Sequence, residues 1–211
     1  MINLYDDDQW VNWVDALSEQ NYLVIDNFIS DEELKSFNQF LRKELNQETF
    51  DKAGIGTLDQ FQVDKKIRGD YIRWLNADTD LEVASYFERL GVIIQKLNRY
   101  CYLSLSGSEI HLAHYPQGTY YKRHLDQFQQ RNNRLISVIL YLNENWQEGD
   151  GGELKVYLDH EEKTIQPIGR RLVLMRSNLV EHEVLMTHKD RFSITGWLLY
   201  QPVGLGFLQP A

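Results

Sequence analysis

The sequence predicts an α+β protein that is mainly β, with a double-stranded β-helix (jelly-roll) core buttressed by N-terminal helices. Apolar residues recur at helical spacing in the first hundred residues, whereas after Gly107 short β-rich runs alternate with turn signals. The run Ile136–Leu142 is almost continuously apolar, which predicts a strand buried on both faces. A helical half followed by at least five short strands indicates helices packed against one sheet of a closed β architecture.

Three segments carry the helical pattern. Residues 6–20 present two tryptophans, a valine and a leucine at helical spacing, after an acidic start that suits a helix N-terminus. Ser30 and Glu33 have the spacing of a capping box, and residues 34–45 continue with an apolar stripe. Residues 80–101 form the third amphipathic segment. We interpret these stripes as packing surfaces.

The strands are shorter and are separated by polar segments. A short strand is predicted at residues 22–25 and another at residues 67–74. Residues 46–66 are polar and contain glycines, so we expect a long loop, and such loops in compact domains are usually functional or disordered. The remaining strands are expected at residues 109–115, 135–142, 153–158, 171–176 and 191–200.

Composition excludes several classes of protein. A chain of 211 residues is within the usual range of one domain. The formal charge of −9 argues against nucleic-acid and anionic-membrane partners, which bind basic faces. The single cysteine, Cys101, excludes an internal disulfide framework. The N-terminus lacks a signal-peptide pattern, and no apolar run reaches the length of a membrane span. We therefore expect a cytoplasmic protein.

A small set of polar residues predicts a metal centre. His124 and Asp126 are two positions apart, so on an extended segment both side chains share one face. A second imidazole follows at His182, and Arg191 comes nine residues later. Two histidines and one carboxylate with open positions are the ligand set of non-haem Fe(II) oxygenases. An arginine facing a barrel interior needs an anionic partner, and a bound carboxylate would supply one.

The order of these residues resembles the Fe(II)- and 2-oxoglutarate-dependent dioxygenases, specifically their prolyl-hydroxylase branch. The matching residues span roughly 54–200 and are Ile67-Arg68-Gly69-Asp70-x-Ile72-x-Trp74, Tyr115-Pro116, Gly118-Thr119, Tyr121-x-x-His124-x-Asp126, Tyr141-Leu142-Asn143, Trp146, Gly151-Gly152-x-Leu154, His182-Glu183-Val184 and Arg191-x-x-Ile194-Thr195-x-Trp197. The first fifty residues carry no matching motif.

The resemblance implies roles for individual residues. It makes His124, Asp126 and His182 the metal ligands, and it gives Arg191 the distal carboxylate of 2-oxoglutarate. The expected cosubstrate-binding residues are Arg191, Tyr141, Tyr115, Leu154 and Thr195, and the expected substrate-side residues are Tyr121, Trp197, Arg68 and Asp70. Asp126 also favours a hydroxylase, because halogenating relatives lack this carboxylate.

The implied activity is hydroxylation of a prolyl residue in a protein, with Fe(II), 2-oxoglutarate and O2, release of succinate and CO2, and ascorbate as a further candidate cofactor. The expected organisation is one dioxygenase domain, 1–211. Residues 1–105 would form helical support with a lid loop and an edge strand, and residues 106–201 the jelly-roll catalytic core. In the resembling enzymes the loop before the edge strand covers the active site when substrate binds.

Two alternatives remain open, and a third is disfavoured. The chain could hydroxylate a small molecule or free amino acid, or it could be a non-catalytic metal-binding jelly-roll module. A zinc hydrolase would need a general base beside an open ligand position, and strand alternation turns Glu181 and Glu183 away from the metal.

Two groups of residues receive no functional role. The other four histidines, His111, His114, His160 and His188, are interpreted as structural or surface residues. The basic cluster of Lys122, Arg123, Arg131 and Arg134 is interpreted as a solvated loop.

Overall fold

The computed structural model describes residues 5–53, 67–127 and 133–200. Its helices are α1 (Asp7–Gln20), α2 (Asp31–Asn46), the short 3-10 helix η2 (Leu81–Val83) and α3 (Ala84–Cys101). Its strands are β1 (Tyr22–Ile25), β2 (Asp51–Lys52), β3 (Tyr71–Trp74), β4 (Gly107–Tyr115), β5 (Tyr121–His124), β6 (Arg134–Tyr141), β7 (Leu154–Tyr157), β8 (Glu162–Ile165), β9 (Leu172–Arg176), β10 (Glu181–Val184) and β11 (Arg191–Leu199).

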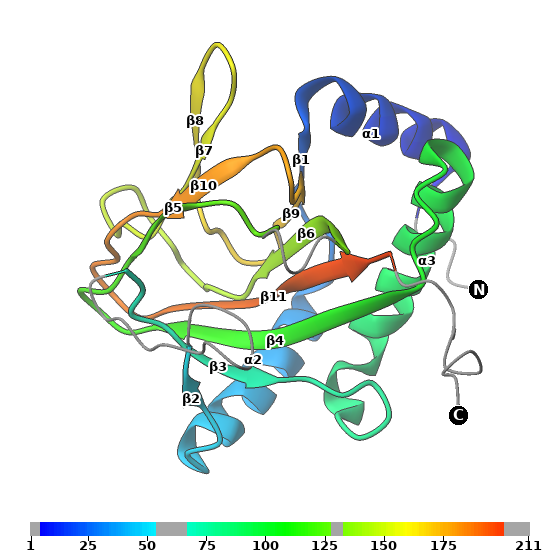
Figure 1. The fold of residues 1–211 in the computed structure, drawn as a ribbon. Coiled ribbons are helices and arrows are strands. Elements are labelled where there is room, and N and C mark those ends of the chain that lie inside the picture. Colours follow the sequence, from blue (N-terminus) through cyan, green and yellow to red (C-terminus); the bar gives the residue numbers. More distant parts are fainter. Residues whose placement is uncertain (1–4, 54–66, 128–132, 201–211) are drawn as a thin grey trace, which may run out of the picture.

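The strands form two antiparallel sheets (Figure 1), which confirms the predicted jelly-roll core. The major sheet has the order β1-β9-β6-β11-β4-β3-β2, and the minor sheet has the order β5-β10-β7-β8. Buried residues of both sheets share one cluster, in which Ile139 and Tyr141 from β6 meet Leu154 and Val156 from β7. The inner faces of the two sheets therefore pack against each other and enclose the interior in which the site lies.

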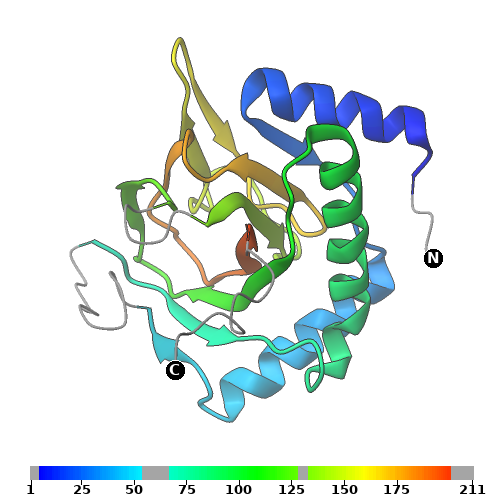
Figure 2. The same ribbon diagram turned by 45° about the vertical axis from the view of Figure 1, so that its right-hand side comes forward.

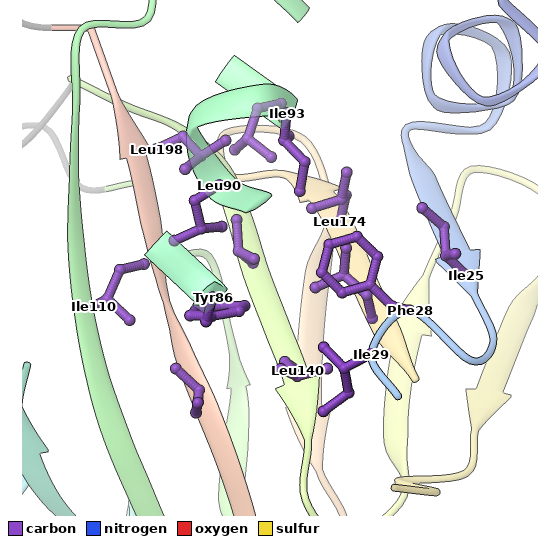
Figure 3. Packing of buried hydrophobic residues seen from close by; sticks show 14 of the residues in the cluster. Ile25, Phe28, Ile29, Tyr86, Leu90, Ile93, Ile110, Leu140, Leu174 and Leu198 are labelled. Atoms are coloured by element: carbon purple, nitrogen blue, oxygen red, sulfur yellow. The ribbon is translucent and has the colours of Figure 1, made fainter. Parts of the chain in front are cut away.

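The helices cover the other face of the major sheet (Figure 2). Figure 3 shows Tyr86, Leu90 and Ile93 of α3 packing against Ile110, Leu140, Leu174 and Leu198 of the sheet, with Phe28 and Ile29 beside them. Each contributing strand places every second residue on this face, and its alternate residues point into the barrel. Packing of the helices thus determines which side chains of β4, β6 and β11 reach the interior.

Local sequence signals explain where the helices begin. The Asp6 side chain accepts a hydrogen bond from the backbone N–H of Gln9 at 2.7 Å. At α2, Ser30 Oγ accepts from Glu33 N and a Glu33 carboxylate oxygen accepts from Ser30 N, so the predicted capping box is present. Such caps satisfy backbone donors that the first helical turn leaves without partners.

Several strands were not located from the sequence. Strands β5, β8 and β10 are only four residues long, and β5 is the polar segment Tyr-Lys-Arg-His, so neither an apolar run nor regular alternation announces it. The predicted strand at residues 22–25 is β1, and it pairs with β9, so the N-terminal half contributes a strand to the major sheet as well as helices. Strand β2 lies within the predicted loop 46–66, of which residues 54–66 are outside the described ranges. The predicted boundary near residue 105 remains a prediction.

No helix among the described residues is long and apolar enough to cross a membrane. This agrees with the absence of a hydrophobic run of that length in the printed sequence.

Gly196 offers a test of how closely two strands approach. A Cβ at this position of β11 would collide with the backbone carbonyl of Glu109 on β4. We expect Gly196→Ala to lower the free energy of unfolding by about 1–3 kcal/mol or more, because the obstructing group is backbone in the middle of the sheet. Thermal unfolding would measure this loss. Gly91→Ala is the matched control: an added Cβ in α3 meets nothing within 4 Å, and its melting temperature should stay equal or rise. An unchanged melting temperature in Gly196→Ala would contradict the prediction.

Candidate active site

Three polar side chains from β5, β10 and the loop after β5 converge in the barrel. His124 ends β5 and His182 lies opposite it on β10 in the strand register. Asp126 follows two residues beyond β5, with its Oδ1 3.4 Å from His124 Nε2 and its Oδ2 3.5 Å from His182 Nε2. One ligand atom from each residue lies within 4.8 Å of the other two. The predicted triad is therefore assembled in space, in a geometry that could hold one metal ion.

Hydrogen bonds and electrostatics suit these groups to metal binding. The Nδ1 atoms of His124 and His182 lie 2.7 and 3.1 Å from the carbonyls of Lys122 and Val180, which leaves both Nε2 atoms facing Asp126. Burial opposes the charged form of Asp126, but the nearby imidazoles of His182 and His124 outweigh it and hold the pKa of this carboxyl well below its usual value. Burial also lowers the pKa of His182. At neutral pH the site thus presents a carboxylate and neutral imidazole, a donor set that fits Fe(II).

Arg191 is a charged residue that is almost fully buried in the interior. Its exposed fraction is 2%, and its Nε donates to the Gly152 carbonyl at 2.8 Å. Its guanidinium carbon lies 5.0 Å from the ring centres of both Tyr115 and Tyr141. Within the described part of the chain, no carboxylate pairs with Arg191, and the buried Tyr141 hydroxyl beside it makes no hydrogen bond of ordinary geometry. A buried cation next to an unsatisfied hydroxyl is suited to an external carboxylate, such as that of 2-oxoglutarate.

Two of the other predicted cosubstrate residues, Tyr115 and Tyr141, contact Arg191. Burial raises the pKa of Tyr141, and burial together with Asp70 raises that of Tyr115, so both hydroxyls stay protonated and can donate. Leu154 is fully buried in the same cluster as Tyr141 and forms an apolar wall. Thr195 lies on β11, and its hydroxyl donates to the Val138 carbonyl at 3.0 Å, so it contributes to the strand pairing.

The predicted substrate-side residues form two groups. Tyr121 stacks on the ring of His124 at 3.6 Å between centroids, and the Arg68 guanidinium lies 4.4 Å from the Tyr121 ring centre. Arg68 also pairs with the buried Asp70 through two hydrogen bonds of 2.7 and 2.5 Å. The structure therefore connects Arg68 and Asp70 to a metal-ligand candidate through one aromatic ring.

Trp197 belongs to a second group, on the neighbouring strands. Its ring centre lies 5.7 Å from that of His111 and 6.4 Å from that of Trp74, and Trp74 is half exposed. The Arg134 guanidinium carbon lies 3.3 Å from the Trp197 ring centre, and Arg134 also pairs with Glu109 at 2.8 Å. These residues form a wall that extends from the interior to the surface.

This wall corrects one prediction and sharpens another. Arg134 does not belong to a solvated loop: it begins β6 and is 6% exposed, because stacking on Trp197 and pairing with Glu109 compensate its burial. Arg131, from the same predicted cluster, lies outside the described residues. His111 is buried and faces Trp197, and burial lowers its pKa to about 3, so its imidazole is neutral; its structural role stays a prediction.

Two serines near Asp126 were not identified from the sequence. Ser137 Oγ donates to Asp126 Oδ2 at 2.6 Å, and Ser177 Oγ lies 2.9 Å from Ser137 Oγ. A signal existed for Ser137, because it interrupts an apolar strand and is four residues before Tyr141, on the same face of β6. Ser177 carries no comparable signal, since it lies just after β9 and far from Asp126 in sequence.

Comparisons with known proteins agree with this geometry. A sequence family described as the 2OG-Fe(II) oxygenase superfamily matches residues 110–199. The chain is 30% identical to a Pseudomonas putida prolyl-4-hydroxylase, with a TM-score of 0.83 and coverage of 92% of this chain and 100% of that one. It is 26% identical to a Trichoplax adhaerens prolyl hydroxylase solved with a hypoxia inducible factor oxygen degradation domain peptide fragment, with a TM-score of 0.81 and coverage of 94% and 96%.

A curated relative shows the same relationship in sequence. The chain is 29% identical to the hypoxia-inducible factor prolyl hydroxylase of Caenorhabditis elegans. The match covers 87% of this chain and 27% of that longer protein. The family match, the prolyl-hydroxylase relatives and the assembled His-Asp-His triad confirm the resemblance seen in the sequence. The chain therefore belongs to the 2OG-Fe(II) oxygenase superfamily and, within it, to the prolyl-hydroxylase branch, so it is a dioxygenase that uses Fe(II), 2-oxoglutarate and O2.

Proposed function

We propose that this chain hydroxylates a prolyl residue in a protein substrate. The observation that carries this proposal is the convergence of His124, Asp126 and His182 in the same barrel as Arg191, which is buried and has no carboxylate partner among the described residues. The chain is also similar to a prolyl-4-hydroxylase along nearly its whole length. The Trichoplax relative was solved with a peptide fragment, which supports a polypeptide as the substrate of this chain as well. The single cysteine supports a reducing, cytoplasmic location.

In this proposal His124, Asp126 and His182 hold Fe(II) through two Nε2 atoms and one carboxylate oxygen. When bound, Fe(II) with 2-oxoglutarate and O2 supplies the oxidising power that inserts one oxygen atom into a C–H bond and releases succinate and CO2. Three protein ligands would leave coordination positions open for the cosubstrate and O2. Ascorbate remains a candidate reductant.

Arg191 and Tyr141 would hold the distal carboxylate of 2-oxoglutarate. The guanidinium offers a rigid pair of donors, and the unsatisfied Tyr141 hydroxyl adds a third. The Tyr115 ring lies at the same distance from this guanidinium, and Leu154 closes an apolar wall. Because Arg191 Nε already donates to Gly152, the remaining guanidinium N–H groups keep one fixed direction. These residues bind the cosubstrate in one orientation and exclude water from it.

The substrate would approach along Trp197 and Tyr121. Tyr121 stacks on His124, Trp197 lies beside the buried His111, and the flat apolar faces of both rings suit a pyrrolidine ring. A hollow of about 280 Å³ is lined by Arg68, Asp70, Lys52, Gly118 and Thr119, among other residues, and Arg68 also contacts the Tyr121 ring. We infer that Arg68 and Asp70 shape the place where a chain flanking the target proline would lie. The predicted lid at residues 54–66 is outside the described residues, so its role remains a prediction.

Gly152 provides a test of the Arg191 position. It has a φ of +66°, its carbonyl accepts from Arg191 Nε, and an added Cβ would stand 2.9 Å from Arg191 Cδ. We expect Gly152→Ala to displace Arg191 and raise the KM for 2-oxoglutarate roughly tenfold, which corresponds to about 1.4 kcal/mol of lost binding. Steady-state succinate production would measure it.

Gly149→Ala is the matched control for this variant. Gly149 also has a positive φ, +93°, but an added Cβ there meets nothing within 4 Å. This control should share the backbone strain and keep the parental KM. An equal rise in KM in both variants would show that backbone strain, and not the displacement of Arg191, causes the rise.

The proposed function is tested by identifying the product. The protein would be incubated with Fe(II), 2-oxoglutarate and a lysate from cells that lack the gene, and recovered proteins would be compared by peptide mass spectrometry with a sample lacking 2-oxoglutarate. We expect the mass of one oxygen atom on a proline of a particular protein. Dependence on His182 would link the product to this site. Hydroxylation of a free amino acid or small molecule, with all proteins unmodified, would overturn the proposal in favour of that alternative.

A further inference from the structure

The three candidate metal ligands are not held in the same way. His124 and His182 lie on β5 and β10, opposite each other in the register, so backbone pairing positions both. Asp126 lies beyond the end of β5, where no strand pairing fixes it. The loop that carries it is attached by other contacts: Gln127 N donates to the Ser177 carbonyl at 3.1 Å, and Gln127 Nε2 donates to the Arg134 carbonyl at 3.1 Å. The position of Asp126 therefore depends on β6 and the end of β9.

Ser137 and Ser177 form a directed hydrogen-bond chain to Asp126. An ionised carboxylate only accepts, so Ser137 must donate its single hydroxyl hydrogen to Asp126 Oδ2, at 2.6 Å. Because that hydrogen is used, the 2.9 Å contact between the two serines requires Ser177 to donate to Ser137. Both serines are 1% exposed, so water does not compete for these bonds. The order of donation is Ser177, Ser137, Asp126.

This chain makes the two carboxylate oxygens of Asp126 unequal. Oδ2 accepts a short, charge-assisted hydrogen bond from Ser137. Oδ1 accepts no hydrogen bond from either serine and lies 3.4 Å from His124 Nε2. An oxygen that accepts such a short hydrogen bond from a serine is a poorer metal ligand than Oδ1, whose neighbour is the imidazole of another candidate ligand. A carboxylate that bound through both oxygens would also occupy a fourth coordination position, and only two would then remain for a bidentate cosubstrate and O2.

We propose that Ser137, oriented by Ser177, is a positioning residue that commits Asp126 to bind the metal through Oδ1 alone. This inference rests on the proposed metal centre and deepens it. Ser137 holds the one ligand that the strands do not hold, and it keeps the third open position available. Partners of metal ligands typically contribute 10- to 100-fold to metal affinity, so the loss should be measurable.

The experiment is an anaerobic titration of the metal-free protein with Co(II), followed by the visible absorption of the bound ion, and with Fe(II) in competition. The variants are Ser137→Ala, Ser137→Thr and Ser177→Ala, and Tyr86→Phe is the control. Tyr86 is fully buried in the helical layer and its hydroxyl has no hydrogen-bond partner among the described residues, so this control removes a buried hydroxyl far from the site.

We expect Ser137→Ala to weaken Co(II) and Fe(II) binding by about 10- to 100-fold and to alter the Co(II) spectrum, because the carboxylate gains freedom to bind through both oxygens. Ser137→Thr keeps the hydroxyl and should restore the parental affinity and spectrum. Ser177→Ala should cause a smaller loss, and Tyr86→Phe none. Thermal unfolding of the metal-free variants would show that the protein remains folded, and Ser177→Ala tests the same chain if Ser137→Ala does not fold.

Two results would overturn the inference while the metal centre stands. One is unchanged affinity and spectrum in Ser137→Ala and Ser177→Ala, and the other is a failure of Ser137→Thr to restore them. A parental protein that binds neither ion, or that binds them equally well without His182, would instead overturn the proposed metal centre itself. The two failures are therefore distinguishable.

Discussion

Replacing His182 by alanine is expected to abolish Fe(II) binding and 2-oxoglutarate turnover while the fold persists. His182 provides one of three candidate ligands, and two remaining ligands do not retain the metal against water and buffer. Its side chain is 5% exposed and lies in a four-residue strand of the minor sheet, away from the helical core. The substitution therefore removes the metal without removing the main apolar contacts that stabilise the protein.

Anaerobic Fe(II) titration, succinate production and circular dichroism would measure the three parts of this prediction. His160→Ala is the matched control, because His160 is an exposed imidazole in a bend and belongs to no cluster of metal-ligand candidates among the described residues. We expect it to retain parental binding and turnover. A His182→Ala protein that consumed 2-oxoglutarate at the parental rate would contradict the ligand assignment.

Replacing Arg191 by alanine is expected to produce the second largest effect, a large rise in the KM for 2-oxoglutarate. The variant would leave the distal carboxylate of the cosubstrate buried without its cation. Truncation of one partner of a buried charged pair costs about 2–5 kcal/mol, which corresponds to about 30- to 4,000-fold in affinity. Fe(II) binding should change little, because Arg191 enters the site from β11 and contacts none of the three ligands in the described contacts.

Arg191→Lys separates charge from geometry in the same position. A lysine keeps the positive charge but loses the rigid fork and the contact from Nε to the Gly152 carbonyl, so its KM should lie between those of the parent and the alanine variant. The KM would be determined from succinate formation at saturating Fe(II). A rise of less than about threefold in Arg191→Ala, under 1 kcal/mol, would mean that another cation holds the cosubstrate.

The helical half of the fold could be predicted from the sequence because its signals are local. The capping box at Ser30 and the apolar stripe of α3 involve residues within a few positions of one another, and both are present in the structure. The continuously apolar β6 was predicted for the same reason. Extended structure was assumed around His124 and His182, but no pattern located strands β5 and β10, because short polar strands exist through their pairing with each other and with β7. The partner strand, and not their own sequence, determines them.

The same distinction holds for the site. The types and order of His124, Asp126, His182 and Arg191 sufficed to predict the family, which the comparisons confirm, and to name candidate ligands. The roles of the individual residues remain predictions that the variants above would test. What the sequence determined by itself was the chemical inventory: two imidazoles, one carboxylate and one arginine that needs an anion.

Only the tertiary structure decided how these groups are supported. Ser137 and Ser177 meet because β6 pairs with β9, and Arg134 is buried because it begins β6 beside Trp197 of β11, although its sequence neighbours suggested solvent. A periodic pattern records which face of an element is buried, but it carries no information about which distant side chain lies opposite. That depends on strand register and on the packing of the two sheets, and these are properties of the whole chain.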